Sequence, residues 1–104
     1  MKIQWAEPAV LDLESIRDYI ARDSEYYAAE FVGRILNAVE NLSVLPGMGR
    51  KVPEIDDNKI REIIFNSYRI IYRVDDEKEN VLILAVIHAA RDMNILKPRP
   101  WEIV

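Results

Sequence analysis

The chain contains no cysteine and a single histidine, His88, among its 104 residues. The lack of cysteine excludes a disulfide framework and any site built from thiolate ligands. One histidine excludes the multi-histidine sites of most zinc hydrolases, and we expect neither a metal ion nor a cofactor. The longest apolar run, residues 81–87, is far shorter than the roughly 18 residues that a membrane helix needs. The first ten residues lack the apolar run of a secretory signal, so we expect a cytoplasmic protein.

Negative charge prevails, with a formal net charge of −4, which argues against nucleic-acid binding by a broad basic face. The distribution is uneven. Residues 1–45 hold four basic and eight acidic side chains, whereas residues 46–74 hold six basic and four acidic ones. The second half can therefore carry a local basic patch, although an ordinary solvated sheet face fits the same count. The length predicts one domain over residues 1–104.

Two amphipathic helices are predicted in the first half. Residues 1–5 alternate in polarity and indicate a short strand. Apolar residues spaced by three and four then predict one helix up to Ile20 and a second one up to Leu45. Ser24 can cap the second helix, and Pro46 ends it. The short link between the two helices predicts an antiparallel hairpin.

Three strands are predicted in the second half, at residues 60–65, 68–74 and 81–88. Short turns between them favour an antiparallel meander, and the apolar run of the last strand is typical of a strand covered on both faces. The expected fold is therefore α+β, a strand and a helical hairpin packed on one face of a mostly antiparallel sheet, in the order β-α-α-β-β-β. Prolines limit residues 91–104 to at most a short helix, with Trp101 as a packing anchor.

Along residues 68–74, one face of the predicted strand carries Arg69, Ile71 and Arg73, and the other face carries apolar and aromatic side chains. Arg69 and Arg73 share one face of this strand, and arginine is rarely buried without a partner. We therefore expect their face to be open and to lie opposite the helices. The strand register decides whether Arg61 joins them. His88 ends the last strand, close to Arg91, so the expected surface is partly basic and bordered by the tail.

Common catalytic motifs are missing from the sequence. It has no GxGxxG motif, no phosphate-binding P-loop and no GxSxG nucleophile elbow. His88 is a candidate general acid or base, but a lone histidine at a strand end more often makes a local structural hydrogen bond.

The chain nevertheless resembles the RelE/ParE family of type II toxin–antitoxin toxins. Five segments carry this resemblance in the order and spacing of the family: IQW with the following AxxDLxxIxxYI helix (residues 3–20), LPGMGR (45–50), IREI (60–63), YRIIYRV (68–74) and VIHAARD (86–92). The resemblance implies the same order of elements as the periodicity. It also implies a growth-inhibiting toxin of the kind that stabilises plasmids, neutralised by an antitoxin that is encoded beside it.

Two branches of the family differ in mechanism. RelE-like members are ribosome-dependent mRNA endonucleases that use several basic side chains and a tyrosine or histidine near the C-terminus. Arg69 matches one of these arginines, but the paired lysines of the preceding strand and the C-terminal tyrosine or histidine are missing. The sequence looks closer to the ParE branch, whose members poison DNA gyrase and are not enzymes. The implied partners are gyrase and a ParD-like antitoxin of the ribbon-helix-helix type.

The candidate target-contacting residues are Arg61, Arg69, Arg73, His88 and Arg91. Two alternatives stay open. The first is an mRNA endonuclease on the ribosome that uses Arg61, Arg69 and His88. The second is an inactive relic that only binds its antitoxin.

Overall fold

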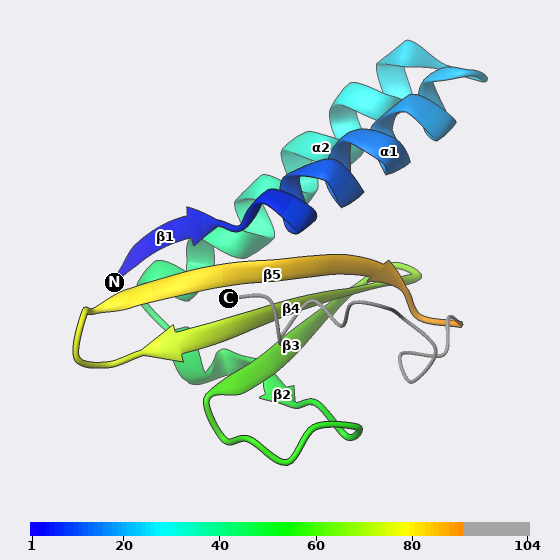
Figure 1. Cartoon of the computed structure of the whole chain (residues 1–104). Coiled ribbons are helices and arrows are strands. Elements are labelled where there is room, and N and C mark those ends of the chain that lie inside the picture. The colour runs from blue at the N-terminus through cyan, green and yellow to red at the C-terminus, as the bar shows by residue number, and fades with distance from the viewer. Residues whose placement is uncertain (91–104) are drawn as a thin grey trace.

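A helical hairpin lies over one face of a twisted sheet in the computed structural model, which describes residues 1–90 (Figure 1). Arg91, Trp101 and the predicted tail lie outside the described residues. The helices and strands are β1 (Lys2–Trp5), α1 (Glu7–Ala21), α2 (Glu25–Glu40), β2 (Arg50–Lys51), β3 (Ile60–Phe65), β4 (Tyr68–Asp75) and β5 (Asn80–His88). No helix within residues 1–90 is long and apolar enough to cross a membrane.

Both helices begin as their sequences predict. Pro8 occupies the first turn of α1, where its missing N–H costs no hydrogen bond. Ser24 caps α2, and its hydroxyl accepts a hydrogen bond from the Tyr27 N–H at 3.2 Å. The α-helix ends at Glu40, however, and two 3₁₀ turns lead to β2. The predicted end at Leu45 was too late because the apolar stripe continues through the first 3₁₀ turn, where Leu42 is buried.

The sheet has the strand order β1-β5-β4-β3-β2. The predicted meander of β3, β4 and β5 is confirmed as antiparallel, while β1 pairs parallel to β5. Asn66, in the tight turn between β3 and β4, has a φ of 51°, a left-handed conformation that asparagine tolerates. The sequence did not predict β2, because two residues are too few to show an alternating pattern.

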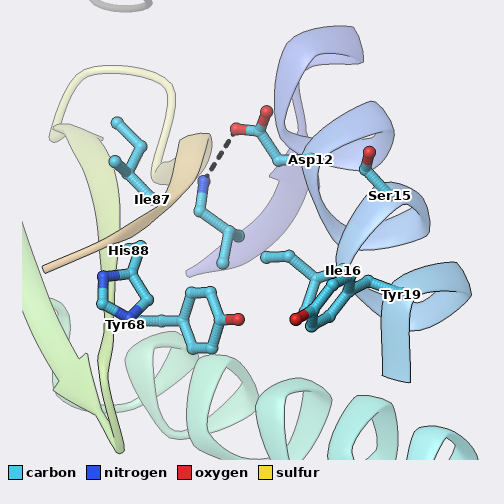
Figure 2. Close-up of a pocket in the computed structure, with 8 residues that line it drawn as sticks. Asp12, Ser15, Ile16, Tyr19, Tyr68, Ile87 and His88 are labelled. Atoms are coloured by element: carbon cyan, nitrogen blue, oxygen red, sulfur yellow. Dashed lines mark hydrogen bonds between the residues drawn. The ribbon is translucent and has the colours of Figure 1, made fainter. Parts of the chain in front are cut away.

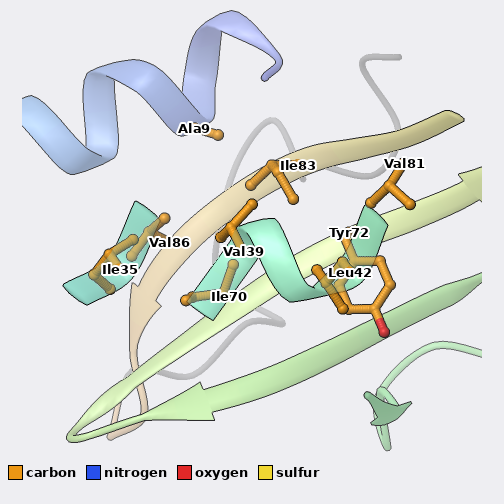
Figure 3. Close-up of a cluster of buried hydrophobic side chains, with 9 residues drawn as sticks. All are labelled: Ala9, Ile35, Val39, Leu42, Ile70, Tyr72, Val81, Ile83 and Val86. Carbon is orange, nitrogen blue, oxygen red and sulfur yellow. The ribbon is translucent and has the colours of Figure 1, made fainter. Parts of the chain in front are cut away.

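The main core lies between the helices and one face of the sheet (Figure 3). Its buried members are Ala9 from α1, Ile35 and Val39 from α2, Leu42, and Ile70, Tyr72, Val81, Ile83 and Val86 from the sheet. Full burial of one such aliphatic side chain contributes about 1.5–3 kcal/mol. The hydroxyl of Tyr72 leaves this cluster and points toward β2 (Figure 3).

A second buried cluster covers the opposite face of the sheet. It consists of Val52, Ile60, Ile71, Leu84, Ala85 and Ile87, with Ile55 packed against it. The strand β5 is thus covered on both faces, as its apolar run predicts. The expectation of an open face opposite the helices is wrong at its centre, because the segment after β2 brings Val52 and Ile55 onto the sheet.

Candidate functional site

Arg69 occupies the centre of a buried cluster of charges on the face of the sheet opposite the helices. Its side chain is only 7% exposed. Its Nε donates to Glu62 Oε1 at 2.6 Å, and its two terminal nitrogens donate to the two carboxylate oxygens of Glu54 at 2.7 and 2.8 Å. Glu62 Oε2 accepts a further hydrogen bond, at 2.7 Å, from Arg50 Nε. The guanidinium of Arg69 is therefore enclosed by two carboxylates and unavailable to a ligand in this structure.

The ion pairs of this cluster determine the protonation of its members. The hydrogen bonds from Arg69 hold the pKa of Glu54 below its ordinary value of 4.5, against a smaller opposing effect of burial. The hydrogen bond with Glu54 in turn raises the pKa of Arg69 above its ordinary range. Both groups are thus charged at neutral pH. The bidentate geometry between Arg69 and Glu54 is that of the strongest carboxylate–guanidinium pairs.

Arg61 lies on the other face of the sheet, because the register pairs it with Tyr72 rather than with a neighbour of Arg69. Its Nη1 donates to the backbone oxygen of Gly49 at 3.0 Å. The Tyr72 hydroxyl also holds this segment, since it accepts from the Gly49 N–H at 2.9 Å and donates to the Pro46 carbonyl at 2.8 Å. Burial raises the pKa of Tyr72, which keeps its hydroxyl protonated. Arg61 and Tyr72 therefore fix the entry into β2.

His88 borders a pocket of about 280 Å³ between α1 and the end of β5 (Figure 2). The rings of Tyr68 and Tyr19 enter this pocket from the sheet and from the helix. Asp12 joins the two sides, because its carboxylate accepts the Val86 N–H at 3.0 Å. The side chain of His88 accepts the Ala90 N–H on Nδ1 at 3.1 Å and contacts Tyr68 edge to face.

The residues that line this pocket determine whether it could catalyse cleavage of a phosphodiester. Its members are Asp12, Ser15, Ile16, Tyr19, Tyr68, Val86, Ile87 and His88. Catalysis at a phosphodiester needs cations near the developing negative charge as well as a base. No lysine or arginine of residues 1–90 lines the pocket. Within the described residues, the pocket therefore offers His88 no lysine or arginine as a neighbour.

The predicted contact residues do not meet in one place. Tyr68 and His88 are directly opposite each other, so His88 lies on the helix side and Arg69 on the reverse side of the sheet. Arg61 shares the side of His88, but their pairing partners, Tyr72 and Tyr68, are four residue steps apart on β4, which is about 13 Å along the strand. Arg73 is half-buried on the face of Arg69. Arg91 lies outside the described residues.

Sequence reasoning missed three members of the charged cluster: Arg50, Glu54 and Glu62. Glu62 left a usable signal, because it is the one acid among the isoleucines of β3 and its parity places it on one face with Ile60 and Ile64. A buried acid in a strand predicts a cationic partner on the neighbouring strand. Glu54 lies in a loop without periodicity, so no pattern in the sequence could connect it with Arg69.

Comparison with known proteins places the chain in a family. The family model of the ParE toxin of the type II toxin–antitoxin system parDE matches residues 3–93. The chain belongs to the ParE toxin family. Within residues 1–90, the match covers both helices, the five strands except for Lys2 of β1, and the whole charged cluster of the toxin.

Solved structures resemble the fold of this toxin. A chain of the chromosomal ParDE toxin–antitoxin system from P. aeruginosa superposes with a TM-score of 0.69 at 22% identity, covering 85% of the toxin and 95% of that chain. The toxin–antitoxin complex RelBE from Mycobacterium tuberculosis gives 0.61 at 23% identity, with coverages of 84% and 95%. The isolated RelE toxin of E. coli gives 0.61 at 17% identity, with coverages of 88% and 86%. No match was found among curated protein sequences.

Both branches of the resemblance are thus represented among the structural neighbours. At these identities the superpositions establish a common fold and do not transfer a mechanism. The predicted β-α-α-β-β-β order and the assignment to the RelE/ParE toxins are confirmed.

Proposed function

We propose that the toxin arrests growth by binding DNA gyrase in the cytoplasm, as a stoichiometric inhibitor rather than as a nuclease, and that a cognate antitoxin neutralises it. Gyrase is the target that the resemblance to the ParE branch implies. The antitoxin follows from membership of a family of toxin–antitoxin toxins.

The observation that carries this proposal is the enclosure of Arg69 by Glu54 and Glu62. This arginine matches a residue of the RelE-like nuclease set, which needs a guanidinium that is open to a phosphate. Here two carboxylates occupy the donors of the guanidinium, and an RNA phosphate would have to displace Glu54 from a bidentate pair. The separation of His88 from Arg69 by the sheet supports the same conclusion.

Two assays on the purified toxin test the proposal. We expect inhibition of DNA supercoiling by gyrase, relieved by the antitoxin, and no cleavage of mRNA on translating ribosomes. Codon-specific mRNA cleavage without an effect on gyrase would instead identify a RelE-like nuclease. Expression without growth arrest, together with intact antitoxin binding, would identify an inactive relic.

A further inference from the structure

An apolar groove of about 320 Å³ lies between α1 and α2. Its apolar lining consists of Trp5 from β1, Val10 and Leu13 from α1, and Val32 and Leu36 from α2. Val10 and Leu36 are large apolar side chains that are 39% and 45% exposed. Within the described part of the chain, no residue of β3, β4 or β5 lines this groove, so it opens away from these strands (Figure 1).

Four residues of α1 form a stripe along one side of this groove. Val10, Glu14, Arg17 and Ala21 are spaced by four, three and four, which places them on one face of the helix. The first three of them line the groove. The stripe therefore has an apolar residue at each end and one charge of each sign in its middle.

This stripe is complementary to a second copy of itself. When two α1 helices pack antiparallel, a two-fold axis at the middle of the stripe brings Glu14 of each chain opposite Arg17 of the other. The same axis brings Val10 opposite Ala21, because the two pairs have the same midpoint on the helix. One arrangement thus forms two ion pairs and two apolar contacts.

Both charges are available for such pairs. Within residues 1–90, Glu14 makes no ion pair. Arg17 pairs with the adjacent Asp18 at 3.0 Å, and both side chains are exposed, by 49% and 70%. An exposed ion pair between neighbouring residues is weak, so Arg17 can exchange it for a pair that is partly shielded from water.

We propose that two copies of this chain associate through their helical hairpins, with each groove covered by the α1 helix of the other copy. The four helices form an antiparallel bundle, and Val10, Leu13, Val32 and Leu36 of both chains form its apolar centre. The two sheets lie outside this bundle, and the charged clusters around Arg69 face away from each other. The inference goes beyond the proposed function and does not depend on the identity of the growth-arrest target.

The charge pattern is the reason for assigning the groove to a second copy. An unrelated partner can bind an apolar groove with any arrangement of charges, but a two-fold interface requires a surface that is complementary to itself. Opposite charges on the two sides of the midpoint of the stripe meet this requirement. Because α1 has 15 residues and is about 22 Å long, the interface is small, and we expect a weak dimer that dissociates in the micromolar range.

Sedimentation equilibrium of the full chain without antitoxin measures this association. We expect the wild type to be in equilibrium between a monomer of 12.1 kDa and a dimer. Glu14→Arg and Arg17→Glu each place like charges across the axis and should raise the Kd of the dimer by about tenfold or more. Lys78→Glu is the matched control, because it makes the same change of charge as Arg17→Glu in the exposed turn before β5. It should change the Kd by less than about threefold.

Mixing the two variants tests the proposed register. In a mixture of Glu14→Arg with Arg17→Glu, each residue 14 meets the opposite charge at residue 17 of the other chain, so a heterodimer of roughly wild-type affinity should form. The double variant that carries both changes should dimerise as well. A mixture of Glu14→Arg with Lys78→Glu should associate more weakly. If neither the first mixture nor the double variant recovers the dimer, the proposed register is overturned.

Leu36→Gln tests the apolar part of the groove and should raise the Kd of the dimer, whereas Leu45→Gln changes an exposed leucine outside the groove and should leave it unchanged. The charge reversals at exposed positions serve if Leu36→Gln fails to fold. A wild type that stays monomeric at about 200 µM would overturn the proposal. A monomeric wild type whose affinity for the antitoxin falls in Leu36→Gln would overturn it in favour of the antitoxin as the occupant of the groove.

Discussion

Replacing Arg69 by methionine separates a structural arginine from a target-binding one. The variant keeps most of the side-chain volume but removes three charge-assisted hydrogen bonds of 2.6–2.8 Å. Glu54, which is 27% exposed, can turn to water after the loss. Glu62 is fully buried and, among residues 1–90, would keep only its bond to Arg50. The loss of folding stability therefore comes mainly from the buried negative charge of Glu62.

The expected magnitude follows from this geometry. Removing one partner of a buried ion pair usually costs about 3–5 kcal/mol, because it leaves a buried charge uncompensated. Arg50 still pairs with Glu62, so we expect a loss near the lower end, about 3 kcal/mol. That is a large part of the roughly 5–15 kcal/mol that stabilises a typical domain. Urea denaturation of Arg69→Met and wild type, followed by circular dichroism, measures this difference.

Two further variants make the result interpretable. Arg34→Met removes an exposed arginine that pairs with Glu30 on α2, and we expect it to cost less than about 0.5 kcal/mol. The double variant Glu62→Leu with Arg69→Met removes both buried charges, and its stability should return to within about 1–2 kcal/mol of wild type. If Arg69 is structural, this double variant also arrests growth when it is expressed without the antitoxin.

Either of two results would refute this reasoning. A loss of less than about 1 kcal/mol in Arg69→Met would mean that the cluster does not support the fold. A stable double variant that no longer arrests growth would mean that Arg69 or Glu62 contacts the target directly.

Three other predictions concern the segment before β2 and the loop after it. In Gly49→Ala, a Cβ would lie 2.5 Å from a backbone oxygen of β3, so urea denaturation should show a loss of about 1–3 kcal/mol, whereas Gly47→Ala, with open space, should change stability by less than about 0.5 kcal/mol. Tyr72→Phe leaves the buried Gly49 N–H without its acceptor and should cost about 1–3 kcal/mol in the same assay; an unchanged midpoint would contradict this role. Arg69 lowers the pKa of Glu54, so this pair stabilises the fold above pH 4.5 and the contribution is lost as the pH falls through the lowered pKa; Glu54→Gln should therefore flatten the acid branch of the stability curve, and an unchanged slope would contradict the assignment.

The sequence predicted the fold well because its elements have regular patterns. The apolar spacings place both helices, and Ser24 marks the start of α2. The strand β3 has the predicted bounds of residues 60–65, since its apolar run ends at a turn with Asn66. The late end predicted for α2 and the missing β2 are both failures at short, irregular segments, where three-dimensional contacts rather than periodicity determine the backbone.

The candidate site was predicted less well, because it depends on register and on a loop. The alternation of side chains along β4 correctly placed Arg69 on the face opposite the helices. Its predicted exposure was wrong, because it was inferred from the residue type alone. Glu54 and Glu62 compensate the charge of Arg69, and they come from a loop and from a neighbouring strand. Single-strand patterns do not reveal such partners. The position of Arg61 required the pairing with Tyr72, which the turn fixes in three dimensions.

Stoichiometry tests the central claim most directly, because a binding inhibitor is consumed by its target and a nuclease is not. Purified toxin is titrated against a fixed amount of gyrase, and supercoiling is measured at each ratio, with ribosome-bound mRNA as substrate in a parallel series. We predict that the supercoiling activity falls in proportion to the toxin added and is abolished when toxin and gyrase are near equimolar, while the mRNA stays intact. Multiple rounds of mRNA cleavage by substoichiometric toxin, with gyrase unaffected, would contradict the account.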